Sequence, residues 1–305
     1  MDLNKTSSIV GAVLAAVGGT LALSSCDEDG PADPESTGAG SKPVCVTTSW
    51  PLQSLLAEIA GDAMEVHCLL PFDRDVRGWA PPRDVLQELA DADLICLQGA
   101  GLERWAVRAS LPRDRRVQLA APFRDQWLRI ERAVTHRHGQ GDLHTHQGLD
   151  PHVWFVPRLV GLMARAFGDA AQGVRPERRD EIEQRTRSVL ERLEQIEAEF
   201  VRAEARLRGL RVVADHPSFG YLADRFGWDY VELHEDTASL GPVDLVLTEP
   251  GVDEGALLDR LRAAGGELAP ILVIDPGARC ALAGEPFALL SWLGELPEKI
   301  EQALQ

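Results

Sequence analysis

Short apolar runs and longer amphipathic stretches alternate along most of the chain. Short apolar runs indicate strands and amphipathic stretches indicate helices, and their alternation is typical of βαβ units with parallel strands. The sequence therefore predicts an α/β fold of two lobes, each with a parallel-rich sheet flanked by helices. The predicted strands are residues 44–49, 64–70, 94–97, 211–214, 229–233, 245–248 and 271–274, and the predicted helices are residues 52–59, 83–89, 219–226 and 254–264.

A polar segment with one apolar stripe separates the two α/β regions. Its apolar positions are Ile182, Val189, Leu193, Ile196, Phe200 and Leu207. This spacing places them on one face of a helix, and the Glu and Arg residues between them can pair at i,i+4. We expect one long rigid helix that joins the lobes and limits their closure, in a monomer; a coiled-coil dimer is the alternative. The expected boundaries are 44–172 for the N-terminal lobe, 173–207 for the connecting helix and 208–305 for the C-terminal lobe.

The N-terminal residues predict export and lipid anchoring. Lys5 precedes an apolar run from Ile9 to Leu23, which is short for a membrane span and is typical of a signal peptide. It leads to Leu-Ser-Ser-Cys26, which resembles a bacterial lipobox, so residues 1–26 are expected to be a lipoprotein signal peptide with a lipid on Cys26. An uncleaved anchor is the alternative, and it gives the same extracytoplasmic location.

Residues 27–43 are acidic and rich in Gly, Pro and Ser, so we expect a disordered linker. In a Gram-negative organism, an aspartate at position 27 resembles an inner-membrane retention signal, which predicts the periplasmic face of that membrane.

The formal net charge is -17 over 305 residues. Nucleic-acid binding needs a basic surface, so this class of function is excluded. An acidic field attracts cations, although solubility alone also explains such a charge.

The cysteines do not form a metal motif. Cys45, Cys68 and Cys96 fall in predicted strands, where cysteine is usually a small buried apolar residue. A Cys45–Cys68 disulfide between neighbouring strands stays open as an alternative. No CxxC spacing occurs, which argues against a cysteine-based zinc site.

Histidine is concentrated in one segment. Five of the eight histidines lie between residues 136 and 152. Two His-x-His pairs, His136/His138 and His144/His146, fall in a polar, glycine-rich segment that we expect to be a loop over 136–150. Neutral imidazoles bind borderline ions such as zinc or copper, so this segment predicts metal binding. A solvated loop without function is the alternative.

The fifth histidine of this segment, His152, follows Asp150-Pro151 and leads into Val-Trp-Phe. The motif Asp-Pro-His-Val-Trp after a histidine-rich segment resembles the zinc/manganese ABC-transporter substrate-binding proteins (cluster A-I). Further segments are similar to that family in the same order along the chain, and the resemblance as a whole covers residues 43–305. These segments are GAGLERW (99–105), HPSFGYLADRFG (216–227), LTEPGVDEGALLDRL (247–261) and ILVIDPG (271–277).

The resemblance implies a cleft between the lobes, a membrane permease as partner, and four metal ligands, two from each lobe. By position, His152 is the second ligand, His216 the third, and Asp275 the fourth or an auxiliary one. The residues agree, because His216 and Asp275 follow predicted strands, and N and O donors suit tetrahedral zinc. For Asp275, a turn residue before Pro276 is the alternative.

The first ligand departs from the family pattern, because Arg77 stands where a histidine is expected. Arginine stays protonated and cannot bind a metal cation. Three outcomes are open. The site has three protein ligands and a water; or His144 or His146 completes it; or it is degenerate, and Arg77 pairs with Asp275 or Glu249 to bind an anionic or chelated solute. His136, His138 and Glu249 are weaker candidate ligands.

The sequence thus predicts an extracytoplasmic binding protein that captures Zn²⁺, and less readily Mn²⁺, for an ABC importer. It is not expected to be an enzyme. A zinc hydrolase would need an open metal position and a general base. Glu249 is the only obvious base, and no HExxH motif occurs.

Overall fold

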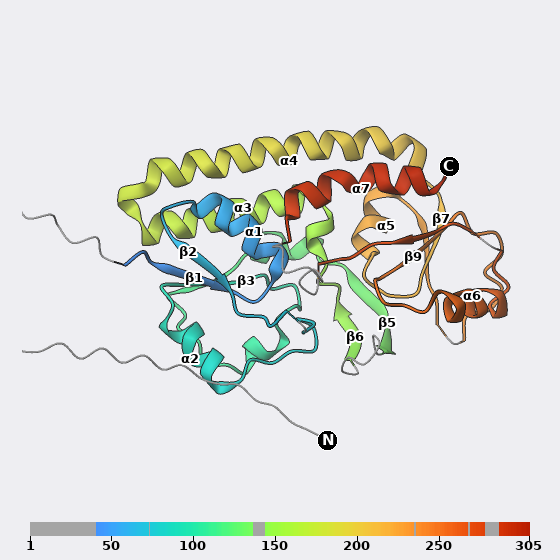
Figure 1. Ribbon diagram of the computed structural model, residues 1–305, viewed down its shortest axis with the longest axis horizontal. Coiled ribbons are helices and arrows are strands. Elements are labelled where there is room, and N and C mark those ends of the chain that lie inside the picture. The colour runs from blue at the N-terminus through green and yellow to red at the C-terminus, as the bar shows by residue number, and fades with distance from the viewer. Residues whose placement is uncertain (1–40, 73, 137–143, 235, 268, 278–286) are drawn as a thin grey trace, which may run out of the picture. The chain divides into compact units, whose positions relative to one another are not determined.

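Two four-stranded parallel sheets form the framework of the described residues (Figure 1). The N-terminal sheet has the strand order β2-β1-β3-β4 and the C-terminal sheet the order β10-β9-β7-β8. The strands of the first sheet are β1 (Val44–Thr47), β2 (Glu65–Cys68), β3 (Leu94–Leu97) and β4 (Arg116–Gln118). Those of the second are β7 (Arg211–Ala214), β8 (Asp229–Glu232), β9 (Leu245–Thr248) and β10 (Ile271–Val273). Every predicted strand is present, and the two-lobed α/β prediction is confirmed.

The computed structural model describes residues 41–72, 74–136, 144–234, 236–267, 269–277 and 287–305, with backbone only for 131–136 and 144–147. The predicted signal peptide, Cys26, most of the predicted linker, His138 and Cys280 lie outside the described residues. No helix within the described residues is long and apolar enough to cross a membrane.

Helices connect and cover the strands. The α-helices are α1 (Trp50–Ala60), α2 (Arg83–Asp91), α3 (Pro157–Val174), α4 (Arg179–Leu207), α5 (Gly220–Phe226), α6 (Glu254–Ala263) and α7 (Leu289–Ala303). Short 3₁₀-helices are η1 (Arg104–Val107), η2 (Ala121–Gln126), η3 (Val153–Phe155) and η4 (Pro176–Arg178).

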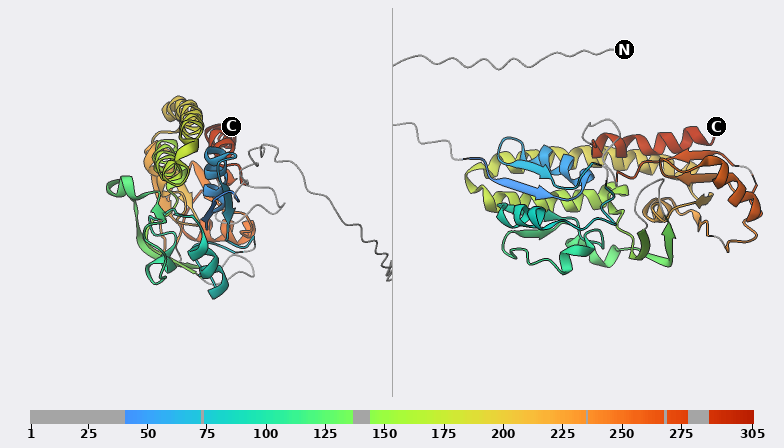
Figure 2. Two further views of the ribbon diagram at one scale, coloured as in Figure 1. Left: turned by 90° about the vertical axis from the view of Figure 1, so that its left-hand side faces the viewer. Right: turned by 60° about the horizontal axis from the view of Figure 1, so that its bottom comes forward.

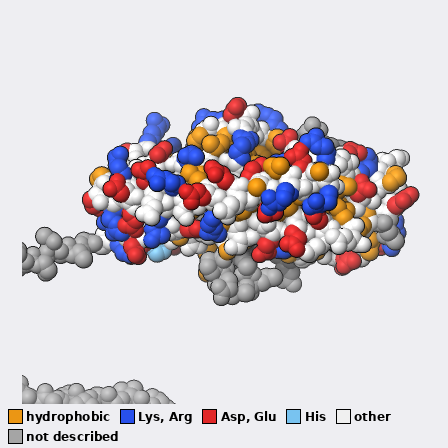
Figure 3. Space-filling model, turned by 90° about the horizontal axis from the view of Figure 1, so that it is seen from above, with side chains coloured by type: hydrophobic (Ala, Val, Ile, Leu, Met, Phe, Trp, Pro, Cys, Tyr) orange, Lys and Arg blue, Asp and Glu red, His pale blue; other side chains and the backbone are white. Residues whose placement is uncertain are grey.

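The long helix α4 confirms the periodicity argument. Of the predicted stripe, Ile196 is half-buried and the other five positions are buried. Glu and Arg cover its outer side and pair along the helix, for example Arg187 with Glu183 at 2.9 Å. Figure 3, which looks onto this side, shows acidic and basic side chains interspersed. Acidic residues in the first turn and Arg206 in the last complement the helix dipole.

Two further helices pack beside α4 and were not predicted from the pattern. Helix α3 is joined to α4 by the short η4 and runs antiparallel to it (Figures 1 and 2). Helix α7 contacts both α4 and α1. Because α7 follows the C-terminal sheet in sequence but packs on α1 of the N-terminal lobe, the connection between the lobes is a layer of helices rather than one helix.

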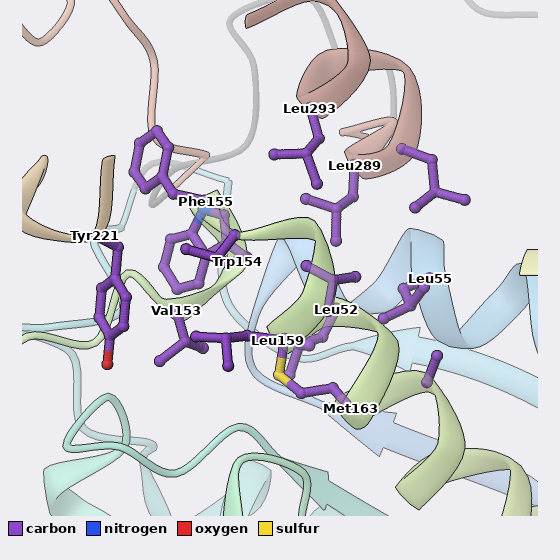
Figure 4. Packing of buried hydrophobic residues seen from close by; sticks show 14 of the residues in the cluster. Leu52, Leu55, Val153, Trp154, Phe155, Leu159, Met163, Tyr221, Leu289 and Leu293 are labelled. Carbon is purple, nitrogen blue, oxygen red and sulfur yellow. The ribbon is translucent and has the colours of Figure 1, made fainter. Parts of the chain in front are cut away.

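The apolar core runs through this helical layer. Leu52 and Leu55 of α1, Leu159 and Met163 of α3, and Leu289 and Leu293 of α7 are buried together (Figure 4). Trp154 and Phe155 of η3 belong to the same cluster. The segment that follows His152 is therefore held by the core itself.

The described part of the histidine-rich segment is not the loop that we expected. It lies in an antiparallel hairpin of β5 (Arg129–His136) and β6 (His144–Leu149). The register pairs His136 with His144 and Val134 with His146. The expectation of a loop over 136–150 is therefore wrong for His136 and for residues 144–149. The glycines suggested a loop, but backbone pairing with the β-prone residues before His136 extends the strands.

The three cysteines of the N-terminal sheet are unbridged. Cys45 Sγ lies 3.6 Å from Cys96 Sγ across β1 and β3, and burial raises the pKa of the Cys96 thiol. Cys45 faces Val66 rather than Cys68 in the register of β1 and β2, so the structure contains no Cys45–Cys68 bridge.

The contact between α3 and α4 requires a glycine at position 168. A Cβ there would lie 2.6 Å from Thr186 Oγ1 and 3.1 Å from Thr186 Cγ2. Thr186 cannot turn away without losing the hydrogen bond that its hydroxyl donates to Ile182 O at 2.8 Å. Gly168→Ala is expected to lower the free energy of unfolding by about 1–3 kcal/mol through overpacking.

Gly173→Ala is the matched control, because a Cβ at this position of α3 meets no atom within 4 Å. It should leave stability unchanged or raise it by up to about 1 kcal/mol, as alanine favours helix. Urea unfolding of both variants measures the difference. Equal effects would show that the close approach at Gly168 does not limit the packing.

Candidate metal centre

His152 is fully buried directly after β6, at the start of η3. The side chain of Asp150 holds it: Asp150 Oδ1 accepts a hydrogen bond from His152 N at 2.9 Å and lies 2.7 Å from His152 Nδ1. A carboxylate on Nδ1 keeps the proton there and leaves the lone pair on Nε2. This is the usual arrangement behind a metal-binding histidine.

The N-terminal sheet supports this histidine through its backbone. Gln98, directly after β3, donates a hydrogen bond from Nε2 to Pro151 O at 2.7 Å. The buried carboxylate of Glu103 accepts hydrogen bonds from Gln98 N at 2.9 Å and Gly99 N at 3.0 Å. Gln98 was not predicted to belong to the site, and its position directly after a buried strand is the one sequence feature that points to it.

Three buried polar side chains meet at the carboxyl ends of the C-terminal strands. His216 and Ser218 follow β7, and Glu249 follows β9. His216 Nδ1 lies 2.9 Å from Glu249 Oε1 and 2.8 Å from Ser218 Oγ, and the Ser218 hydroxyl also donates to Glu249 Oε1. His216 thus repeats the arrangement of His152, with a carboxylate on Nδ1. Ser218 was missed, although it stands two residues after His216.

The guanidinium of Arg77 lies between these two groups. Its Nη1 is 3.5 Å from His152 Nε2 and donates to Ser218 Oγ at 3.3 Å. Its Nη2 is 2.6 Å from Asp75 Oδ2 and 3.6 Å from Glu249 Oε2, and its Nε donates to Asp75 Oδ1 at 3.0 Å. The Arg77 side chain is only 8% exposed. The structure therefore joins His152 of one lobe and Glu249 of the other through one buried cation.

These charges stabilise one another. Burial alone would lower the pKa of the Arg77 guanidinium, but the carboxylates of Asp75 and Glu249 raise it above its usual value. Burial would raise the pKa of Glu249, but His216 and Arg77 hold it well below its usual value. Glu249 is therefore an anion, and Arg77 is a cation in its contact.

The other predicted ligands lie after β10 and on the hairpin. Asp275 follows β10, and its Oδ1 accepts a hydrogen bond from Gly277 N at 2.8 Å, as in the turn that was the alternative. His136, His144 and His146 lie on the hairpin, where only the backbone is described. Among the described residues, no three His, Cys, Asp or Glu side chains stand close enough together to hold a metal ion as they are. The guanidinium explains this, because it keeps its partners farther apart than the 2.0–2.3 Å bonds of zinc would.

Comparison with known proteins fits this geometry. The profile of the family described as "Zinc-uptake complex component A periplasmic" matches residues 45–247. The chain belongs to this family. Membership confirms the resemblance seen in the sequence, and the description is that of a component of an uptake complex outside the cytoplasm, not of an enzyme.

Curated relatives in this family are distant. The zinc-binding lipoprotein AdcA of Streptococcus pneumoniae (strain ATCC BAA-255 / R6) is 22% identical over 192 residues, covering 62% of this chain and 38% of that protein. The high-affinity zinc uptake system protein ZnuA of Bacillus subtilis (strain 168) is 22% identical over 196 residues, covering 64% of this chain and 61% of that protein. The chain thus spans well under half of the length of the AdcA relatives that it matches.

Solved structures share the fold. The periplasmic zinc-binding protein TroA from Treponema pallidum superposes with a TM-score of 0.67 at 19% identity, covering 87% of this chain and 99% of that one. The Zn(II)-bound AdcA of Streptococcus pneumoniae gives a TM-score of 0.65 at 17% identity, covering 87% of this chain and 58% of that one. These likenesses establish the two-lobed architecture of the family for this chain.

Glu103 gives the support beneath His152 a dependence on pH. Burial raises the pKa of its carboxyl to about 7, against the opposing hydrogen bonds from Gln98 N and Gly99 N. The folded protein thus holds this proton more tightly than the unfolded chain, whose value is near 4.5. The associated stability is complete below about pH 4.5 and is lost as the pH rises through about 7.

Glu103→Gln should remove that dependence. Between pH 4.5 and 7.5, the free energy of unfolding of the wild type is expected to fall by roughly 3 kcal/mol more than that of the variant. Urea unfolding across this range measures it, with Glu88→Gln, exposed on α2, as control. Parallel curves for wild type and Glu103→Gln would contradict the assignment.

Proposed function

We propose that this protein is the extracytoplasmic substrate-binding component of a metal ABC importer, which captures Zn²⁺ between its lobes and delivers it to a membrane permease. One observation carries the proposal: each lobe holds a buried histidine with a carboxylate on Nδ1, and one buried cation contacts the histidine of the first lobe and the carboxylate of the second. Family membership and the zinc-binding names of its relatives support the choice of ligand.

The ligands we propose are His152 and His216 through their Nε2 atoms, with Asp275 and Glu249 as oxygen donors. Imidazole donors favour zinc over manganese, which prefers carboxylates and water. His144 or His146 is the proposed replacement for the missing first histidine, since β6 ends one residue before Asp150. With His136 and His138, these residues would also collect metal at the hairpin.

The rival function, capture of an anionic or chelated solute by Arg77, has less support. Each nitrogen of the guanidinium already faces an internal acceptor: Asp75, Glu249, Ser218 or His152. Two buried carboxylates beside one guanidinium also repel an anion.

The remaining features complete the proposal. The mature chain would be a monomer held at the membrane by a lipid on Cys26, with lobes at 44–172 and 208–305 and the connecting helix within 173–207. The helical layer between the lobes supports a local rearrangement at the site rather than a wide opening.

Calorimetric zinc titration of residues 27–305, which lack the signal peptide and the lipidated cysteine, tests the function. The wild type should bind about one Zn²⁺ per chain in the inter-lobe site with a Kd of about 1 μM or tighter. His152→Ala combined with His216→Ala should weaken this binding by at least about a hundredfold, because both nitrogen donors are lost. Affinity should also fall in acid, because only the neutral imidazole binds a metal ion.

A control variant and a deletion test whether zinc binds between the lobes or at the hairpin. His67→Ala removes an exposed histidine on β2 and should change nothing. Deletion of residues 136–147 should reduce, but not abolish, the binding. A wild type that takes up no zinc would end the proposal, and loss of zinc in the deletion alone would move the site to the hairpin.

A further inference from the structure

Arg77 occupies the place where the two lobes present their cation-binding groups. Its Nη1 faces His152 Nε2, the nitrogen whose lone pair a metal would use. Its Nη2 faces Glu249 of the opposite lobe. The guanidinium and a metal ion would therefore compete for the same atoms and the same space.

The buried carboxylates favour a cation at this position. Asp75 and Glu249 have side chains only 9% and 7% exposed, and an unpaired carboxylate in such surroundings is strongly unfavourable. The guanidinium supplies the compensating charge from within the chain. Because arginine does not lose its proton at physiological pH, this compensation is always available.

The arginine also links a loop of the N-terminal lobe to the C-terminal lobe. Arg77 lies on the segment between β2 and α2, and Asp75 of the same segment binds both its side chain and its backbone N–H. The backbone N–H groups of Gly78 and Trp79 donate to Asp75 O at 3.2 and 3.1 Å. Asp75, Arg77 and this turn therefore form one hydrogen-bonded unit.

We propose that Arg77 is a tethered cation that fills the metal position while the protein is empty, and that metal capture is an exchange of the guanidinium for the ion. This inference rests on the function proposed above. The exchange replaces one positive charge by two, so a divalent ion competes better than a monovalent one. Return of the guanidinium would displace the metal, which gives the protein its own means of release at a permease.

Zinc titration of Arg77 variants tests the exchange. Arg77→Ala removes the competitor and should bind Zn²⁺ at least about tenfold more tightly than the wild type. Arg77→Lys keeps the charge but loses the two-point contact with Asp75, so its affinity should lie between those of the wild type and Arg77→Ala. Arg74→Ala, an exposed arginine of the same segment, is the matched control and should not change the affinity.

Two further measurements keep the test valid if Arg77→Ala is unstable without metal. The rise in Tm on adding zinc should be larger for Arg77→Ala than for the wild type, because only the variant lacks a cation when empty. In the wild type, zinc should speed hydrogen exchange at the amides of Gly78 and Trp79, since their turn leaves with Arg77.

The outcomes distinguish this proposal from the one on which it rests. Zinc binding of equal or lower affinity in Arg77→Ala, with unchanged exchange at Gly78 and Trp79 in the wild type, would overturn the exchange and leave the metal-binding function standing. Absence of zinc binding in both proteins would overturn both.

Discussion

Two buried carboxylates, Asp75 and Glu249, approach the same point from opposite lobes and require a positive charge between them. In the described structure, Arg77 provides it. Removing one partner from such a buried pair typically costs about 3–5 kcal/mol, so this requirement constrains the positions of the lobes. His152 and Ser218 contact the same guanidinium, and His216 lies beside Ser218 and Glu249. The site is thus built for a cation, and its identity depends on which cation is held best.

The surrounding fold keeps both sides of this point in place. Trp154 Nε1 donates to Pro276 O at 2.8 Å, which joins η3 to the segment after β10. Phe155 packs against Trp292 of α7 with ring centroids 5.1 Å apart. A Cβ on Gly220 would lie 2.7 Å from Asp150 Oδ2, so α5 can approach the residue that orients His152 only because it begins with glycine. These contacts cross between the lobes beside the site, and they favour motion of the Arg77 segment over motion of a whole lobe.

The parts of the fold that depend on local pattern were predictable from the sequence. Strands such as Leu94–Leu97 are continuous buried runs, and α4 has a polar face that makes its apolar stripe visible. Helix α3 was missed although its buried residues share one face, because its three glycines and few charged residues make it look less like a helix than the Glu- and Arg-rich α4. Helix α7 and the histidine hairpin depend on long-range packing and pairing, which periodicity does not report. Tertiary contacts therefore decided the elements that the pattern left ambiguous.

In the candidate site, too, local sequence features predicted some residues, and contacts between distant segments brought in the others. His152 and His216 were found because their motifs and their positions after strands are local features, whereas Gln98, Ser218 and the role of Asp75 depend on contacts between distant segments. Arg77 was visible in the sequence as a departure, but its consequence was not, because the residues alone left three outcomes open. The geometry favours a view that none of them stated in full. A guanidinium whose nitrogens all face internal acceptors has little left to bind an anion, yet two of those acceptors, His152 and Glu249, are among the proposed metal ligands. An arginine in this position is therefore better understood as a competitor of the metal than as a receptor for another solute.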